Sequence, residues 1–253
     1  MCRGVRLPGR SQGGSRLCYH RAMAQRIQVS VIIPTLNAGE TLPATLRALA
    51  PAIEAGLVGE IIVADGGSSD ATRASAGEYG AHVVSAPRGR GVQLDTGAAA
   101  ASGDWLLFLH ADTVLGDGWQ SAVRGFIEAP GNEARAAVFR FALNDADPRA
   151  RRIDSLARWR GRVLGLPYGD QGLLIERAHY ARVGGFKPLP LMEDVDLVRR
   201  IGRANIVELD ADALTSAARY RRGGWWLRPL RNLSILTLYF LGVPPAHLKR
   251  LYG

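Results

Sequence analysis

The chain has 253 residues, of which 47% are hydrophobic and 22% are charged. This length and composition suit one substantial buried core, which excludes a largely disordered protein. The formal net charge is +9, and residues 1–28 contain six arginines and no acidic residue. Because most of the positive charge lies in that short tail, we do not expect the protein to bind nucleic acid.

Residues 1–28 form a basic tail that we predict to be disordered, or to result from a start codon placed too far upstream of Met23. The tail lacks the apolar segment of a secretory signal. It also contains both cysteines of the chain, Cys2 and Cys18. The remaining sequence therefore has no disulfide or thiolate metal site, which fits a cytoplasmic protein.

Strands and helices are predicted to alternate at short spacing from residue 29 onward. A β-branched strand over Val29–Ile33 ends at Pro34, and Asn37 with Glu40 resembles a capping box at the start of a helix. The buried face of that helix is predicted to consist of Leu42, Leu46, Leu49 and Ile53. Ile61–Val63 is predicted to be a second buried strand.

The next elements continue this alternation. An alanine-rich helix ends at Tyr79, a strand covers His82–Ser85, and a helix covers Gln93–Ala101. Trp105–Leu109 is apolar without alternation, as expected for a central strand covered on both faces. The pattern predicts an α/β fold with a doubly wound, mostly parallel sheet and helices on both faces. Ligands bind such sheets at the carboxyl ends of the strands.

The regular spacing of the predicted strands and helices loosens after Asp112. We expect this second half of the chain to form the side of the ligand site that binds a second, acceptor substrate. The predicted elements are a helix over Trp119–Glu128, a strand over Ala136–Phe141, a helix that includes Ile153, Leu156 and Trp159, a strand over Leu173–Ile175 and a helix over Glu193–Arg200.

The C-terminal region is predicted to be an amphipathic helical segment, residues 223–253, that follows one domain over residues 29–222. Its longest apolar stretch, Leu230–Val243, is shorter than the roughly 20 residues of a spanning helix and is interrupted by polar residues. The segment is therefore expected to contact the inner face of a membrane rather than to cross it.

Two short motifs follow predicted strands and carry potential ligands. Asp65–Asp70, with two glycines, allows a ligand to approach the backbone closely, and the Asp65 carboxylate can accept a hydrogen bond from a base or sugar. The alternative is an ordinary turn capped by Ser68 or Ser69. Neither a P-loop nor a Gly-x-Gly-x-x-Gly after the first strand is present, which argues against ATPases and dinucleotide enzymes.

Three segments in this order, Val31–Asn37, Asp65–Asp70 and Phe108–Asp112, resemble family 2 glycosyltransferases of the GT-A fold. The resemblance extends over Val29–Arg200 and includes Gly184–Phe186 and Glu193–Leu197. It implies transfer of a sugar from a nucleotide diphosphate donor to an acceptor hydroxyl, with inversion and a divalent metal, Mg²⁺ or Mn²⁺. Donor base, donor sugar, acceptor and oligomeric state stay open.

The resemblance also implies roles for particular residues. The nucleotide pocket would be lined by Pro34, Thr35, Asn37, Glu40, Asp65, Gly66, Ser68 and Arg90. Asp112 would ligate the metal. His110 replaces the first aspartate of the usual Asp-x-Asp motif, so it would either ligate the metal or contact the sugar diphosphate.

Asp194 occupies the position that the family uses for the general base, with Glu193 as the second candidate. An inverting transfer needs one carboxylate to accept the proton of the attacking hydroxyl. The alternative is that these acids only stabilise a helix N-terminus. The predicted donor-sugar and acceptor contacts are Asp170, Gln171, Glu193, Arg222 and Trp225. For the first two the alternative is a polar turn, and for the last two a membrane interface.

A narrower resemblance is to radical-SAM/selenodomain-associated transferases, a bacterial subgroup proposed to act in arsenosugar biosynthesis. It is carried by four segments: Gly89–Gly91, His110–Thr113, Gly169–Gly172 and Pro190–Asp194. Two other functions compete with glycosyl transfer. One is a nucleotidyltransferase, which would release pyrophosphate, and the other is a non-catalytic protein that binds nucleotide sugars.

Overall fold

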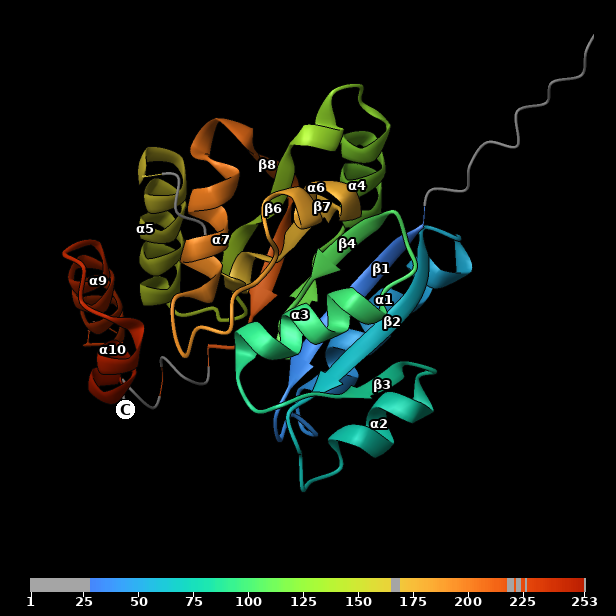
Figure 1. Cartoon of the computed structure of the whole chain (residues 1–253), viewed down its shortest axis with the longest axis horizontal. Coiled ribbons are helices and arrows are strands. Elements are labelled where there is room, and N and C mark those ends of the chain that lie inside the picture. Colours follow the sequence, from blue (N-terminus) through green and yellow to red (C-terminus); the bar gives the residue numbers. More distant parts are fainter. Residues whose placement is uncertain (1–27, 165–168, 218–220, 222–223, 226, 253) are drawn as a thin grey trace, which may run out of the picture.

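The computed structural model describes residues 28–164, 169–217, 221, 224–225 and 227–252 (Figure 1). Residues 1–27 of the predicted basic tail and Arg222 lie outside the described residues.

An eight-stranded sheet forms the centre of the molecule, with the strand order β3-β2-β1-β4-β7-β6-β8-β5. The strands are β1 (Val29–Thr35), β2 (Val58–Asp65), β3 (His82–Ser85), β4 (Trp105–Phe108), β5 (Thr113–Leu115), β6 (Ala136–Leu143), β7 (Leu173–Glu176) and β8 (Ile206–Thr215). The first four strands pair in parallel, whereas β7 is antiparallel to both β4 and β6. The parallel arrangement predicted for the first half is therefore confirmed.

Helices cover both faces of this sheet, as Figure 1 shows for α3 in front and α1 behind. The helices are α1 (Leu42–Glu54), α2 (Thr72–Glu78), α3 (Arg90–Ala100), α4 (Trp119–Glu128), α5 (Pro148–Leu164), α6 (Arg177–Arg182), α7 (Glu193–Ile201), α9 (Leu227–Phe240) and α10 (Pro245–Tyr252). Short 3-10 turns lie at Asn132–Ala134, Gly169–Gln171 and Arg203–Asn205.

The apolar core is divided by the sheet into two layers. Alternate residues of β1 point to opposite sides, so that Val31 and Ile33 pack with α1 and α4, whereas Ile32 packs with α3 and α7. Both faces of β1 are buried, which explains why Val31, Ile32 and Ile33 are apolar without alternation. The predicted α/β fold with helices on both faces is confirmed.

The predicted start of the first helix is wrong. Helix α1 begins at Leu42, and no side chain caps it. Asn37 instead has a φ of 53°, and its side-chain oxygen accepts a hydrogen bond from the backbone NH of Ser69 at 2.9 Å. Asparagine tolerates this left-handed conformation better than most residues. The buried face is correct for its three leucines, but Ile53, in the last turn, is 41% exposed because Ala52 faces the core there.

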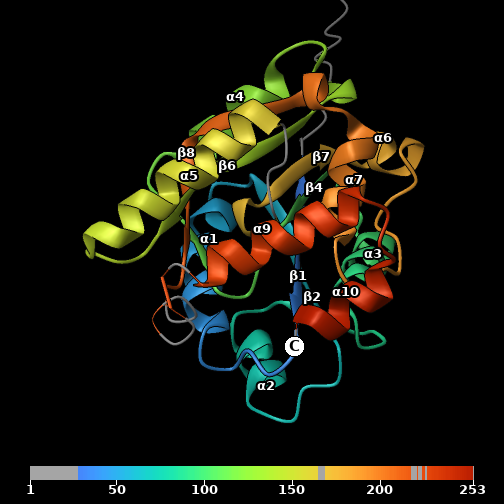
Figure 2. The same cartoon turned by 90° about the vertical axis from the view of Figure 1, so that its left-hand side faces the viewer.

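Helices α9 and α10 pack against the start of α7, the helix that carries Asp194 (Figure 2). Ile235, Leu236 and Leu248 form a buried cluster with Met192 and Val195. Met192 has a left-handed φ of 65° directly before α7. Among the described residues, no helix is long and apolar enough to cross a membrane.

Candidate functional site

Asp65 lies at the carboxyl end of β2, beside Thr35 at the end of β1. Its carboxylate is buried and accepts hydrogen bonds from the Thr35 hydroxyl at 3.2 Å and the backbone NH of Ser68 at 3.1 Å. The Ser68 hydroxyl and the NH of Gly67 also donate to it. Burial opposes ionisation of Asp65, but these hydrogen bonds outweigh it and lower the pKa. The carboxylate is therefore ionised and held in one orientation.

The loops after β1 and β2 are joined by hydrogen bonds around Asp65. The NH of Asn37 donates to the Ser68 hydroxyl at 2.8 Å, and the NH of Gly66 donates to the carbonyl of Thr35 at 2.9 Å. The structure thus brings together six of the predicted nucleotide residues: Pro34, Thr35, Asn37, Asp65, Gly66 and Ser68. Glu40 lies farther along the same loop, with an exposed side chain.

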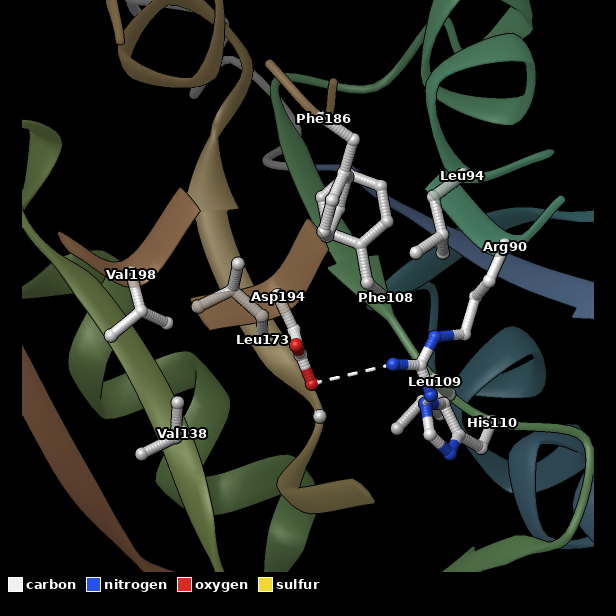
Figure 3. Close-up of a pocket in the computed structure, with 11 residues that line it drawn as sticks. Arg90, Leu94, Phe108, Leu109, His110, Val138, Leu173, Phe186, Asp194 and Val198 are labelled. Carbon is white, nitrogen blue, oxygen red and sulfur yellow. Dashed lines mark hydrogen bonds and ion pairs between the residues drawn. The ribbon is translucent and has the colours of Figure 1, made fainter. Parts of the chain in front are cut away.

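Arg90, at the start of α3, joins the end of β4 to the start of α7. Its guanidinium forms an ion pair with Glu193, and its Nη2 lies 3.5 Å from Oδ2 of Asp194 (Figure 3). Its Nη1 lies 3.5 Å from Nε2 of His110. Burial alone would lower the pKa of Arg90, but the charges of Glu193 and Asp194 raise it. Four predicted site residues from three segments therefore form one cluster.

A glycine permits this approach of α3 to α7 and to the loop before it. A Cβ on Gly91 would overlap the backbone carbonyl of Lys187, in that loop, and would lie 3.2 Å from Cβ of Glu193. Any larger residue at position 91 would therefore separate Arg90 from its partners on α7.

The two acidic residues at the start of α7 differ in environment. The side chain of Glu193 is 2% exposed, and burial raises its pKa although Arg90 lowers it. The side chain of Asp194 is 14% exposed and lines a pocket. Glu193 is therefore suited to hold Arg90, and Asp194 is the carboxylate that a ligand can reach.

His110 and Asp112 lie in the turn between β4 and β5, and both are half-buried. The backbone of this turn is fixed, since the NH of Thr113 donates to the carbonyl of His110 at 3.2 Å and that of Ser216 donates to Asp112 at 3.3 Å. Within the described residues, no group of three or more His, Cys, Asp or Glu side chains is arranged to hold a metal. A divalent ion at Asp112 would need further oxygen ligands, which a bound diphosphate can supply.

The remaining predicted residues divide between two places. The charge of Asp170 acts on Arg90, which places Asp170 near the cluster. Gln171 is buried, and its amide donates to the backbone carbonyl of Phe139 at 3.0 Å, so it fixes the sheet. Trp225 packs in an apolar cluster with residues of β6 and α5, away from the Arg90 cluster, and Arg149 lies 5.2 Å from its ring centroid.

Sequence reasoning did not identify the apolar lining of the pocket beside Asp194. Val138, Leu173, Phe186 and Val198 come from different segments of the chain and line the same pocket. The only signal was the Gly184–Phe186 segment within the region of family resemblance, because buried apolar residues give no functional signal of their own.

Comparison with known proteins identifies relatives with the same fold. Glucosyl-3-phosphoglycerate synthase of Mycobacterium tuberculosis is 36% identical over 95 residues, which span 34% of this chain and only 29% of the relative. The Mycolicibacterium smegmatis enzyme of that name is 37% identical over 95 residues, or 34% of this chain and 31% of the relative.

Solved structures extend the likeness over most of the described fold. The M. tuberculosis enzyme in complex with Mn²⁺, UDP-glucose and phosphoglyceric acid superposes with a TM-score of 0.55 and 25% identity, over 74% of this chain and 70% of that chain. Its complex with Mg²⁺ and UDP has a TM-score of 0.53 and 25% identity over the same shares.

The narrower resemblance to radical-SAM/selenodomain-associated transferases stays a prediction. The family model described as Glycosyl transferase family 2 matches residues 30–182, which include Asp65, Arg90 and Asp112. The chain belongs to glycosyl transferase family 2.

Proposed function

We propose that the protein transfers a sugar from a nucleotide diphosphate donor to an acceptor hydroxyl, with inversion and with the help of Mg²⁺ or Mn²⁺. The observation that carries the proposal is the convergence, at one edge of the sheet, of the hydrogen-bonded Asp65 loop and the cluster of Arg90 with Asp194. The Asp65 loop offers a rigid hydrogen-bond acceptor for a nucleoside. The cluster offers the cation of Arg90 and, beside it, the accessible carboxylate of Asp194.

The nucleoside would bind in the loops after β1 and β2. Asp65 would accept a hydrogen bond from the base, since its carboxylate is already oriented by the loop. Pro34, Thr35, Asn37, Glu40, Gly66 and Ser68 would complete this pocket. Arg90, whose side chain is 39% exposed, would meet the diphosphate at the other end of the nucleotide.

Asp112, with His110 beside it, would hold the divalent ion together with oxygens of the donor diphosphate. A carboxylate with phosphate oxygens suits Mg²⁺ or Mn²⁺. The ion would stabilise the charge that develops on the leaving diphosphate.

Asp194 would act as the general base. Its carboxylate would accept the proton of the acceptor hydroxyl while the hydroxyl oxygen attacks the sugar. In the described structure the same carboxylate faces Arg90 at 3.5 Å. Glu193, Asp170 and Gln171 would contribute to the donor-sugar and acceptor side of the site, and so would Arg222 and Trp225.

The donor site is tested by thermal unfolding with a panel of nucleoside diphosphates and their sugars, with and without Mn²⁺. We expect a uridine or guanosine diphosphate to raise Tm, and to raise it more with the metal, because a ligand that binds only the folded state stabilises it. No response across the panel would contradict the donor site. Release of a nucleoside diphosphate, rather than pyrophosphate, from the donor distinguishes glycosyl transfer from nucleotidyl transfer.

We further propose that residues 223–253 attach the protein to the inner face of a membrane. Six of the nine exposed large hydrophobic residues of the described chain lie in or directly after α9 and α10: Leu227, Leu230, Leu233, Phe240, Leu241 and Leu251. Residues 223–253 contain four arginines and lysines and no acidic residue. Exposed leucines among cations are suited to an anionic lipid surface.

Sedimentation with vesicles tests this attachment. We expect the protein to bind vesicles that contain phosphatidylglycerol, more weakly at high salt, and hardly at all to pure phosphatidylcholine. Replacing Leu233 and Leu241 by Gln should weaken binding at least about tenfold, since each leucine contributes roughly 1.5–3 kcal/mol on burial. The matched control is Leu156→Gln, an exposed leucine on α5. An equal loss in the control, or self-association without vesicle binding, would contradict the proposal.

A further inference from the structure

A pocket lies between the sheet and the helices α3 and α7, beside the carboxylate of Asp194 (Figure 3). Its empty space is about 440 Å³, including the part open to solvent. Its apolar lining consists of Leu94, Phe108, Leu109, Val138, Leu173, Phe186 and Val198, and all seven residues are buried. The pocket therefore extends from the proposed base into the apolar layer of the core.

The polar groups of the pocket lie on one side. Figure 3 shows the carboxylate of Asp194 and the guanidinium of Arg90 pointing toward each other, with His110 next to Arg90. Val138 and Val198 lie on the opposite side of Asp194 from Arg90. A ligand in this pocket would thus meet ionic groups at one end and only hydrocarbon at the other.

The proposed nucleoside site does not share this pocket. Asp65, Ser68 and Asn37 lie in the loops after β1 and β2, and none of them lines it. A phosphate or sugar hydroxyl buried against the apolar wall would lose its hydrogen bonds to water, at a cost of about 1–3 kcal/mol or more for each group. The wall therefore selects a hydrocarbon group rather than a part of the donor.

We propose that this pocket binds a compact apolar or aromatic substituent of the acceptor, whose hydroxyl lies at Asp194. The inference rests on the proposed function. Asp194 takes the proton of that hydroxyl, the oxygen bonds to the anomeric carbon of the sugar, and the bond from that carbon to the diphosphate breaks. The acceptor class is an alcohol with a hydrocarbon group close to its hydroxyl. It differs from the phosphoglyceric acid in the structures of the relatives, which has two anionic groups.

Benzyl alcohol is a suitable probe, with glycerol and 3-phosphoglycerate as polar comparisons. Binding would be measured by ligand-observed NMR in the presence of UDP and Mg²⁺. We expect benzyl alcohol to bind more tightly than either polar compound. Val198→Thr keeps the side-chain shape but adds a hydroxyl to the wall, and it should weaken benzyl alcohol binding about fivefold or more. Val138→Thr, on the same side of the pocket as Val198, should have a similar effect.

The matched control is Val123→Thr, because Val123 is a buried helical valine on the other face of the sheet. Equal weakening by Val123→Thr and Val198→Thr would overturn the proposal, and so would tighter binding of glycerol or 3-phosphoglycerate. Binding of UDP, measured on the same samples, reports the donor site separately. A protein that binds benzyl alcohol but not UDP would contradict the proposed function. A protein that binds UDP but not benzyl alcohol would contradict only the acceptor class.

Discussion

Asp194→Asn is expected to bind the donor with unchanged affinity and to transfer sugar about 10²- to 10⁴-fold more slowly, the range typical of general bases. An amide of the same shape cannot accept the proton of the attacking hydroxyl, and it leaves the nucleoside site intact. The loss should appear in kcat, because the interaction is made only in the transition state. The measurement is single-turnover transfer to an identified acceptor, together with calorimetric titration of the donor.

Glu193→Gln is the informative comparison for that experiment. Glu193 is buried and ion-paired with Arg90, so its replacement should disturb the position of Arg90 and weaken donor binding as well as transfer. If Asp194→Asn transfers sugar at a near-normal rate while Glu193→Gln does not, the assignment of Asp194 as the base is wrong.

Asp65→Asn is expected to weaken nucleotide binding by roughly 10- to 100-fold, since a hydrogen bond to a charged group contributes about 1.5–3 kcal/mol. The asparagine also disturbs the hydrogen bonds from Ser68 and Thr35 that orient the side chain. Calorimetric titration with UDP gives the affinity. The rate of transfer at saturating donor should change far less than the affinity.

Asp70→Asn is the matched control, because Asp70 lies in the same loop and accepts hydrogen bonds from the backbone of Gly39 and Thr72. We expect this variant to lower stability without a comparable loss of nucleotide affinity. Equal losses from the two variants would mean that the loop conformation, and not the carboxylate of Asp65, determines binding.

The sequence predicted the first half of the fold well because its signals are local. The strand over His82–Ser85 and the helix over Trp119–Glu128 match the structure at both ends. Strand β8, over Ile206–Thr215, was not predicted. It carries Glu208, Asp210 and Asp212 and is specified mainly by pairing with β6 and β5, which no local pattern reports.

The candidate site could likewise be predicted only where its signals are local in the sequence. Its polar residues could be predicted singly, because each follows a strand or begins a helix. The ion pair between Arg90 and Glu193 joins residues 103 positions apart, and it depends on the tight packing permitted at Gly91. The wall of the pocket likewise needs the tertiary structure, because Val138 and Val198 look like any other core valines.

Met192 connects the chemistry of the site to the far end of the chain. A residue other than glycine in the left-handed region costs about 1–3 kcal/mol, and it persists there only where its surroundings offset that cost. The side chain of Met192 is held by Ile235, Leu236 and Leu248 of the C-terminal helices. The backbone conformation that positions Asp194 is thus strained, and it is stabilised by helices that lie after the residues matched by the family model. We therefore expect a chain shortened to residue 182, where the family match stops, to lack Asp194, and a chain shortened before α9 to lose the contacts that hold Met192.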